Sequence, residues 1–387
     1  MKKLLSITAA LLIVSISVLG CSASTRSKKN SKKKTNKSTE TTVITEDTGL
    51  DWDIFIEPTT TEPTVAEDFT IGISMPTKDL MYWNDSGIYL SDELEALGYS
   101  VDLQFANNDI STQISQIEEM ILEGYKILII GAIDPASLDS VMEYAASEDI
   151  QVIAYNRIIS SPVGVSYYVT YDNYMVGTLQ GEFIVDALDL DNENGPFTME
   201  ITTGDSGNND ALFFFEGAMD VLKPYIDSGK IIVKSGETDI DSCSTEFWSS
   251  EYAQERMDRI LETYYSDGTN LDICLCSNDS VAYGVTNSLL TNYSGSWPII
   301  TGKDCDILNV RNIISDLQAM SVFNELYVLP NQVISMVDDI INGESPEIND
   351  YYTYNIPSYL CAPIVVTKEN YEEILIDSGY YPADLFN

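Results

Sequence analysis

The stretch ILIIGAIDPASLDSVMEYAASEDIQVIAYNR, residues 127–157, decides the fold of this chain. Its continuous apolar run at 127–133 is typical of a strand that is buried on both faces. A helical pattern begins after Asp134, and a second apolar run follows at 151–155. This order predicts a right-handed βαβ unit, whose two strand ends meet at the edge of the sheet where small ligands bind.

Strand and helix patterns alternate through most of the remaining chain. Strands are predicted at 70–75, 100–105, 127–133, 151–155, 197–203, 230–234, 273–277, 297–301 and 319–323. Helices are predicted at 113–123, 172–187, 211–225, 251–265 and 326–341. This alternation indicates an α/β fold of two similar lobes, each a parallel sheet with helices on both faces.

The strand-like segment SYYVTYDN, residues 166–173, leads directly into a helix, which indicates a first crossing between the lobes. Further crossings are expected near 301–304 and 342–346, so that three segments form a hinge around a ligand cleft. The predicted lobes are residues 69–170 with 304–342 and residues 171–303 with 343–387.

The N-terminus has the pattern of an export signal. A basic Met1-Lys2-Lys3 head and an apolar core precede Val-Leu-Gly-Cys, which ends at Cys21 and resembles a bacterial lipoprotein signal. The resemblance implies a signal peptide at 1–20 and a lipidated Cys21 that anchors the chain to the outer face of the cell membrane. An ordinary cleaved signal is the alternative, and either places the protein outside the cytoplasm. Residues 21–68 lack periodicity and predict a disordered tether.

Composition excludes several classes of function. The chain has 61 acidic and 20 basic residues and a net charge of -41, which argues against a nucleic-acid partner. Its lack of histidine excludes Ser-His-Asp and Cys-His catalysis. The sequence has no P-loop and no GxGxxG motif after a strand, so no nucleotide cofactor is expected. No other cofactor is predicted either. Carboxylate pairs could still hydrolyse glycosides, although no spacing singles out a pair.

Cysteines and acidic residues give little support for a metal site. Apart from Cys21, the cysteines are Cys243, Cys274, Cys276, Cys305 and Cys361. Cys274 and Cys276 share one face of a predicted strand, so buried free thiols are expected. The acidic stretch 189–200 partly matches a calcium loop, but its glycine falls one place late, and a solvated loop is predicted instead.

Several segments together resemble one family, the periplasmic sugar-binding proteins of the type I fold, especially the xylose-binding and multiple-monosaccharide-binding branch. They are IGISMPTKDLMYW, NNDISTQISQIEEMILEGYKILIIGAID, VIAYNRII, SYYVTYDNYMVGTLQ, GAMDVLKPYIDSGKI, CSNDSVAYGV and TGKDCDI. The similarity spans about residues 69–367, and the order and spacing of the segments make it specific. It implies capture of a monosaccharide by closure of two lobes.

A sugar presents many hydroxyl groups and an apolar ring face, so its site needs paired donors and acceptors and an aromatic surface. The resemblance implies ligand contacts at Lys78, Tyr82, Trp83, Asn156, Arg157, Asn209, Asp210, Trp248, Asn278, Asp304 and Asn324. Three of these depart from the family pattern. Tyr82 stands where an arginine is expected, Asn156 replaces an aspartate and Asn324 replaces a lysine.

These residues also have structural interpretations. Arg157 and Asp304 could form an ion pair between the lobes. Trp83 and Trp248 could be core residues, and Asn278 could cap a helix.

The predicted function is therefore that of a lipid-anchored monomer that binds a xylose-like pentose or a hexose and delivers it to an ABC transporter permease. Two alternatives remain open: a sugar-sensing subunit for a membrane signalling kinase, and a carboxylate-dependent surface glycosidase. Sugar-responsive repressors look like the same binding core joined to a DNA-binding headpiece. This chain has an export signal and a tether in place of that headpiece, and its charge is strongly negative, so the repressor interpretation fails.

Overall fold

The βαβ unit predicted from residues 127–157 is present in the computed structural model, which describes residues 70–386. Strands β3 (Ile127–Ile130) and β4 (Gln151–Tyr155) pair in parallel, with α3 (Asp139–Ser147) between them. The helix begins later than predicted because the Asp134 carboxylate accepts hydrogen bonds from the Ala136 N–H and the Ser137 hydroxyl, at 3.1 and 2.5 Å. Such local bonds favour a turn over a helix. The predicted signal peptide, Cys21 and the tether lie outside the described residues.

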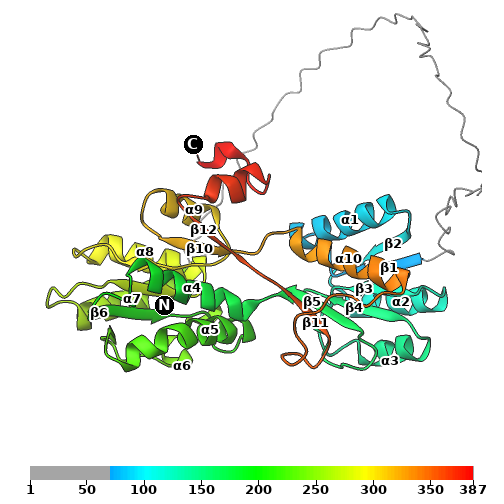
Figure 1. The fold of residues 1–387 in the computed structure, drawn as a ribbon, viewed down its shortest axis with the longest axis horizontal. Helices are drawn as coiled ribbons and strands as arrows, with labels where there is room; N and C mark the ends of the chain where they lie inside the picture. The colour runs from blue at the N-terminus through cyan, green and yellow to red at the C-terminus, as the bar shows by residue number, and fades with distance from the viewer. Residues whose placement is uncertain (1–69, 387) are drawn as a thin grey trace, which may run out of the picture. The chain divides into compact units, whose positions relative to one another are not determined.

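The first sheet has six strands in the order β11-β5-β4-β3-β1-β2, and all of its pairs are parallel. Its other strands are β1 (Thr70–Met75), β2 (Ser100–Phe105), β5 (Tyr167–Tyr171) and β11 (Ser358–Cys361). Helices α1 (Met81–Ala96) and α10 (Val328–Asn342) cover one face, and α2 (Ile110–Leu122) and α3 cover the other (Figure 1). Alternate residues of β1, such as Ile71 and Ile73, are fully buried beneath α1 and α10.

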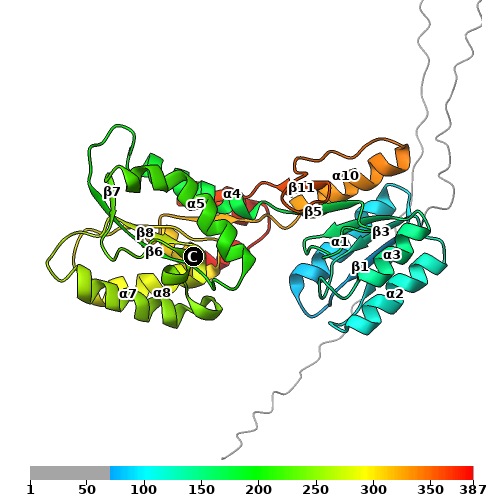
Figure 2. The ribbon, with the colours of Figure 1, turned by 90° about the horizontal axis from the view of Figure 1, so that it is seen from below.

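The second sheet has the order β7-β6-β8-β9 and is also parallel. Its strands are β6 (Phe197–Thr202), β7 (Ile231–Val233), β8 (Ile273–Cys276) and β9 (Ile299–Ile300). Helices α4 (Asn173–Ala187) and α5 (Asn209–Asp227) lie on one face, and α7 (Ser250–Tyr264) and α8 (Asp279–Asn292) lie on the other (Figure 2). The shorter helical elements are α6 (Ile240–Cys243), η1 (Glu246–Trp248), α9 (Ile307–Ile314), η2 (Glu372–Asp377) and η3 (Ala383–Phe386).

Strand pairing differs from the predicted lobe boundaries. Strand β10 (Met320–Phe323) pairs antiparallel with β12 (Ile364–Thr367), and the Ala319 N–H donates to the Ile300 carbonyl at 2.9 Å, so β10 lies with the second sheet and not the first. Conversely, β11 pairs with β5 in the first sheet. The chain therefore crosses after β5, between β10 and α10, and between β11 and β12. The crossings expected near 301–304 and 342–346 are therefore misplaced, because the hydrogen bonds of the strands decide lobe membership.

The five cysteines from Cys243 onward are buried and free, as predicted. Glu200, the last acidic residue of the partial calcium loop, lies in β6 with 1% of its surface exposed. Its carboxylate accepts hydrogen bonds from the Tyr265 hydroxyl at 2.9 Å and the Ser235 N–H at 3.1 Å. Within residues 70–386 no group of three or more acidic or cysteine side chains is placed to hold a metal ion, and no helix of that range is long and apolar enough to cross a membrane.

Helices α4 and α5 approach each other closely because glycines lie at their contact. A Cβ atom added to Gly177 would collide with the Phe214 carbonyl oxygen, and one added to Gly217 would collide with the Tyr174 carbonyl oxygen. Because both obstacles are backbone atoms, a larger residue cannot be accommodated by rotation of a side chain. This contact holds the start of α5 beside the start of α4.

We expect Gly177→Ala to lower the free energy of unfolding by about 2 kcal/mol, because overpacking a tight contact forces the two helices apart. Urea unfolding followed by circular dichroism measures the change. Glu182→Ala, at an exposed position of the same helix, is the matched control and should leave the midpoint unchanged. Equal stability of the two variants would contradict the close contact.

Candidate ligand-binding site

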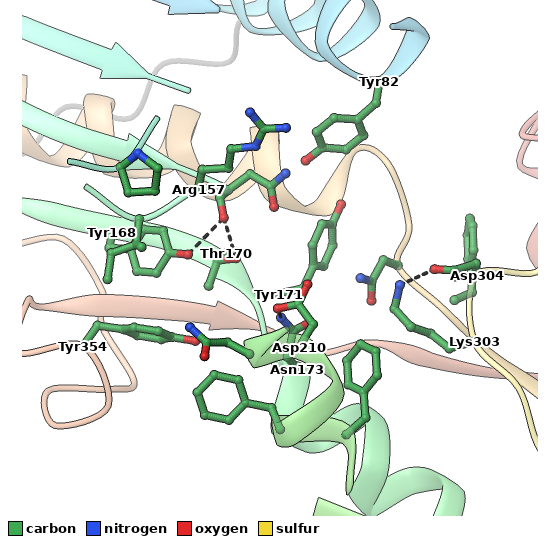
Figure 3. A pocket seen from close by; sticks show the side chains of 18 of the residues that line it. Tyr82, Arg157, Tyr168, Thr170, Tyr171, Asn173, Asp210, Lys303, Asp304 and Tyr354 are labelled. Carbon is green, nitrogen blue, oxygen red and sulfur yellow. Dashed lines mark hydrogen bonds and ion pairs between the residues drawn. The ribbon is translucent and has the colours of Figure 1, made fainter. Parts of the chain in front are cut away.

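A cavity of about 590 Å³ is bounded mainly by residues that follow the carboxyl ends of strands in both sheets. Parallel strands bring such residues to one edge of a sheet, where ligands bind. The lining residues are Tyr82, Pro135, Asn156, Arg157, Ile158, Tyr168, Thr170, Tyr171, Asn173, Asn209, Asp210, Phe213, Phe214, Lys303, Asp304, Asp306, Phe323, Asn324, Tyr354 and Tyr380. Figure 3 shows the labelled members of this set, with Arg157 and Tyr82 on one side and Asp210, Lys303 and Asp304 on another.

On the first lobe, Asn156 and Arg157 leave the end of β4. Asn156 has a φ of 60°, a left-handed conformation that asparagine tolerates better than most residues. Its carbonyl oxygen accepts hydrogen bonds from the Tyr168 hydroxyl at 2.9 Å and the Thr170 hydroxyl at 3.0 Å (Figure 3). These bonds fix the backbone immediately before the arginine.

The Arg157 guanidinium is held from behind. Its Nη1 donates to the Ala132 carbonyl at 3.2 Å, and its carbon lies 5.0 Å from the centre of the Trp83 ring. A guanidinium has five N–H donors in a rigid fork, so donors remain for a ligand in the cavity. This arrangement orients a fork for neighbouring hydroxyl groups.

On the second lobe, acidic groups surround one lysine. The Asp210 carboxylate accepts a hydrogen bond from the Asn173 amide at 2.8 Å, and burial raises the pKa of Asp210. Lys303 pairs with Asp304 and lies 5.6 Å from the centre of the Phe214 ring. Burial alone would lower the pKa of Lys303, but the Asp304 and Asp210 carboxylates raise it overall, so the ammonium group stays charged.

The loop that carries these charges is anchored by a buried carboxylate. Asp279, which is fully buried, accepts hydrogen bonds from the Asp306 N–H at 2.8 Å and from the Gln318 amide and the Ser321 hydroxyl, both at 2.9 Å. Burial, followed by the charge of Asp304, raises the pKa of Asp279. The loop itself has unusual backbone angles, with a φ of 106° at Asp304.

Aromatic rings form part of the wall between the charged groups. Tyr354 meets Tyr168 edge to face, with ring centres 5.0 Å apart, and lies 6.4 Å from Phe213. Burial raises the pKa of Tyr354 to about 12, so its hydroxyl keeps its proton and can donate. Rings of this kind can cover the C–H face of a sugar while their polar ends bond to hydroxyls.

Asn324 and Tyr82 complete the polar wall. The Asn324 Oδ1 atom is buried and accepts no hydrogen bond from any residue in the described range 70–386. Burial, with the neighbouring Tyr155 and Tyr171, raises the pKa of Tyr82 well above its ordinary value. Tyr171 in turn donates to the Glu325 carbonyl at 2.9 Å, which links β5 to the second crossing. The two departures Tyr82 and Asn324 thus supply neutral polar groups.

The cavity brings together seven of the eleven residues that the resemblance implied as ligand contacts. These are Tyr82, Asn156, Arg157, Asn209, Asp210, Asp304 and Asn324. The predicted alternative of an Arg157–Asp304 ion pair is absent from the described structure, because Arg157 donates to backbone carbonyls and Asp304 pairs with Lys303.

The structure does not place the other four predicted residues in the cavity wall. Lys78 is exposed, with its ammonium 5.1 Å from the Phe105 ring centre. Trp83 is 3% exposed and packs in the core of the first lobe, below Arg157. Trp248 packs against Phe214, with ring centres 6.1 Å apart. Asn278 caps α8 by accepting a hydrogen bond from the Val281 N–H.

Several lining residues were missed in the sequence. Phe213 and Phe214 lie one helical turn after Asn209 and Asp210, so their spacing was a usable signal. Lys303 directly precedes Asp304. Tyr354 and Tyr380, in contrast, come from distant segments without a recognisable motif, and only the folded chain brings them to the cavity.

Two lobes with parallel sheets, three crossings and a polar, aromatic-lined cavity between strand ends define a ligand-binding protein of the type I binding-protein fold. The chain belongs to the periplasmic binding protein domain family, whose model matches residues 71–345. This confirms the family resemblance of the sequence.

Similar proteins agree with this assignment. The multiple sugar-binding periplasmic receptor ChvE of Rhizobium radiobacter is 42% identical over 328 residues, which are 82% of this chain and 92% of the receptor. The D-xylose-binding periplasmic protein of Escherichia coli K12 is 31% identical and shows the same coverage. An ABC transporter solute-binding protein from Clostridium phytofermentans, solved with bound β-D-glucose, is 51% identical, with a TM-score of 0.66, and covers 82% of this chain and 100% of its own.

We expect Asp279→Asn to destabilise the second lobe and to weaken ligand binding. An amide presents one acceptor oxygen and one NH₂ group, so one of the three N–H or O–H donors around Asp279 would face another donor. Thermal unfolding should show a lower Tm, and titration with a monosaccharide that the wild-type protein binds should show a higher Kd. Asp186→Asn, at an exposed position of α4 outside the cavity, is the control. A wild-type Tm and a wild-type Kd for Asp279→Asn would show that the Asp279 carboxylate does not hold the loop.

Proposed function

We propose that this protein captures a monosaccharide between its two lobes outside the cytoplasm. The observation that carries the proposal is the composition of the cavity wall. Arg157 and Asn156 from the first lobe, and Asp210 and Asp304 from the second, provide donors and acceptors around a space that aromatic rings also line. Mixed polarity of this kind suits a neutral, hydroxyl-rich ring.

Glucose is the first ligand to test. Its support is the 51% identical solute-binding protein that was solved with β-D-glucose. The D-xylose-binding relative, at 31% identity, makes a pentose the second ligand to test. The neutral side chains of Tyr82, Asn156 and Asn324 occupy positions where the resemblance expected two cations and one anion, so the set of hydrogen bonds offered to the sugar differs from the family pattern.

The mechanism is a shift between open and closed arrangements of the lobes. A sugar that bonds to Arg157 on one side and to Asp210 or Asp304 on the other stabilises the arrangement in which both walls reach it. The fraction of closed protein increases only if the sugar binds the closed arrangement more tightly than the open one, and the size of the increase depends on that difference in affinity. The three crossings are the segments that would absorb this motion.

The sugar is bound and released without chemical change, and an ABC importer permease receives it from a lipid-anchored monomer. Support for this part is the family of binding proteins and the ABC-transporter description of the 51% identical neighbour. The Val-Leu-Gly-Cys pattern supports lipidation of Cys21, which lies outside the described residues.

Arg157→Ala should weaken D-glucose binding at least about 100-fold, or about 2.8 kcal/mol, because it removes charge-assisted hydrogen bonds to the ligand. Isothermal titration of the purified full chain measures the Kd. Arg259→Ala removes a half-exposed arginine from the second lobe, away from the cavity, and is the matched control.

Incubation with glucose and, separately, with a short oligosaccharide, each followed by chromatography, then separates binding from catalysis. Recovery of unchanged glucose is expected, whereas a shortened oligosaccharide would favour a glycosidase. Saturable binding of glucose by wild type and Arg157→Ala with the same Kd would show that the cavity is not the site. If no aldopentose or aldohexose binds to the folded wild-type protein, monosaccharide capture itself is wrong.

Cys21→Ser should release the protein from the membrane fraction without changing its Kd for the sugar, because the change removes the site of the lipid and no part of the cavity. Fractionation of cells with immunoblotting measures the distribution. Cys243→Ser, which alters a buried thiol in the second lobe, is the cysteine control. Unchanged membrane attachment of the Cys21 variant would contradict the lipoprotein signal.

A further inference from the structure

The C-terminal segment, residues 368–386, packs on the loop that carries the acidic groups of the cavity. Leu375 is fully buried in a cluster with Cys305, Val310, Phe323 and Val366. In Figure 1 this segment, drawn in red, lies beside α9 and β12. It follows the end of the family match at residue 345.

Three polar contacts fasten the same segment. The Tyr381 hydroxyl donates to the Cys305 carbonyl at 3.0 Å, directly beside Asp304. The Arg311 guanidinium donates to the Leu385 carbonyl at 2.8 Å, and Lys368 pairs with Asp316 at 2.6 Å. These contacts, together with the buried Leu375, hold the segment in one position against the second lobe.

The consequence is that Tyr380 reaches the cavity. Its ring meets Phe323 at 4.7 Å and Tyr381 at 4.6 Å, both edge to face, and it is among the lining residues with Asp306 and Asn324. Tyr380 as a residue remains 37% exposed and contributes to the cavity wall, so it is accessible to a ligand there. Burial raises the pKa of Tyr380, with smaller effects from Asp304 and Asp306, and its hydroxyl therefore stays protonated and can donate.

We propose that Tyr380 is a specificity-determining residue of the sugar site, supplied by the C-terminal segment, whose ring limits the space beside Asn324 and whose hydroxyl bonds to a ligand oxygen. This inference rests on the proposed sugar-binding function. A ring at this position narrows the cavity where the second crossing begins. Selection between a hexose and a pentose, which differ by one hydroxymethyl group, then depends partly on Tyr380.

The test compares Tyr380→Phe, Tyr380→Ala and the control Tyr371→Phe in the full chain. Tyr371 lies in the same segment, but its hydroxyl donates to Glu372 and its ring does not line the cavity. Titrations with D-glucose and D-xylose give the affinity of each variant and the ratio between the two sugars. Melting curves show that each variant is folded.

Tyr380→Phe should weaken binding of the preferred sugar about fivefold or more, because the ligand bond is lost while the ring stays. Tyr380→Ala should weaken it further and change the glucose-to-xylose affinity ratio at least about threefold, because space opens beside the ligand. Tyr371→Phe should match wild type in both respects.

Wild-type affinities and ratio in Tyr380→Phe would overturn the inference, and this variant decides the question even if Tyr380→Ala does not fold. An equal loss for both sugars in the folded Tyr380→Ala variant would also overturn it, since that result indicates packing alone. In either case wild-type binding of sugar leaves the proposed function standing. Failure of the proposed function looks different, because the wild-type protein itself then binds neither sugar.

Discussion

The buried carboxylate of Asp279 is the interaction on which the second wall of the site depends. It joins the first turn of α8 to the Asp306 N–H and to two side chains, Gln318, which precedes β10, and Ser321, which lies within it. A buried carboxylate without these donors would be very costly, so the surrounding chain must keep all three in place. The loop between β9 and α9, which carries Lys303 and Asp304, is therefore set by a group that does not line the cavity.

The first wall of the cavity is likewise held by groups that lie behind it. The carbonyl oxygen of Asn156 accepts two hydroxyl hydrogen bonds from β5, and Trp83 supports the Arg157 side chain from the core. The polar groups of both walls are thus held by neighbours behind them, which lowers the ordering cost when a ligand binds. The proposed lobe motion then falls to the crossings, where the Tyr171 hydroxyl donates to the Glu325 carbonyl.

Charge in the cavity is mixed although the chain as a whole carries -41. Two cations, Arg157 and Lys303, lie in the lining with three carboxylates, Asp210, Asp304 and Asp306. Burial raises the pKa of Asp210, whereas the positive charge of Lys303 lowers it. The charge of Lys303 therefore offsets part of the repulsion among these carboxylates. Neither a strongly anionic nor a strongly cationic ligand would satisfy both signs, whereas hydroxyl groups donate and accept.

The sequence by itself determined the α/β class, the order of most strands and helices, and the polar residues at the ends of β4 and β9. The class and the order of the elements follow from local periodicity, and the rule that parallel strands end at one edge places Asn156 and Arg157 at the ligand edge of the sheet. Asp304, in contrast, was named through the family resemblance. Only the tertiary structure decided that β10 and β11 exchange lobes relative to the predicted boundaries, that Trp83 supports the site from the core, and that Tyr354 and Tyr380 reach the cavity. Strand partners and long-range contacts depend on which distant surfaces bury each other, and no short segment of sequence records that choice.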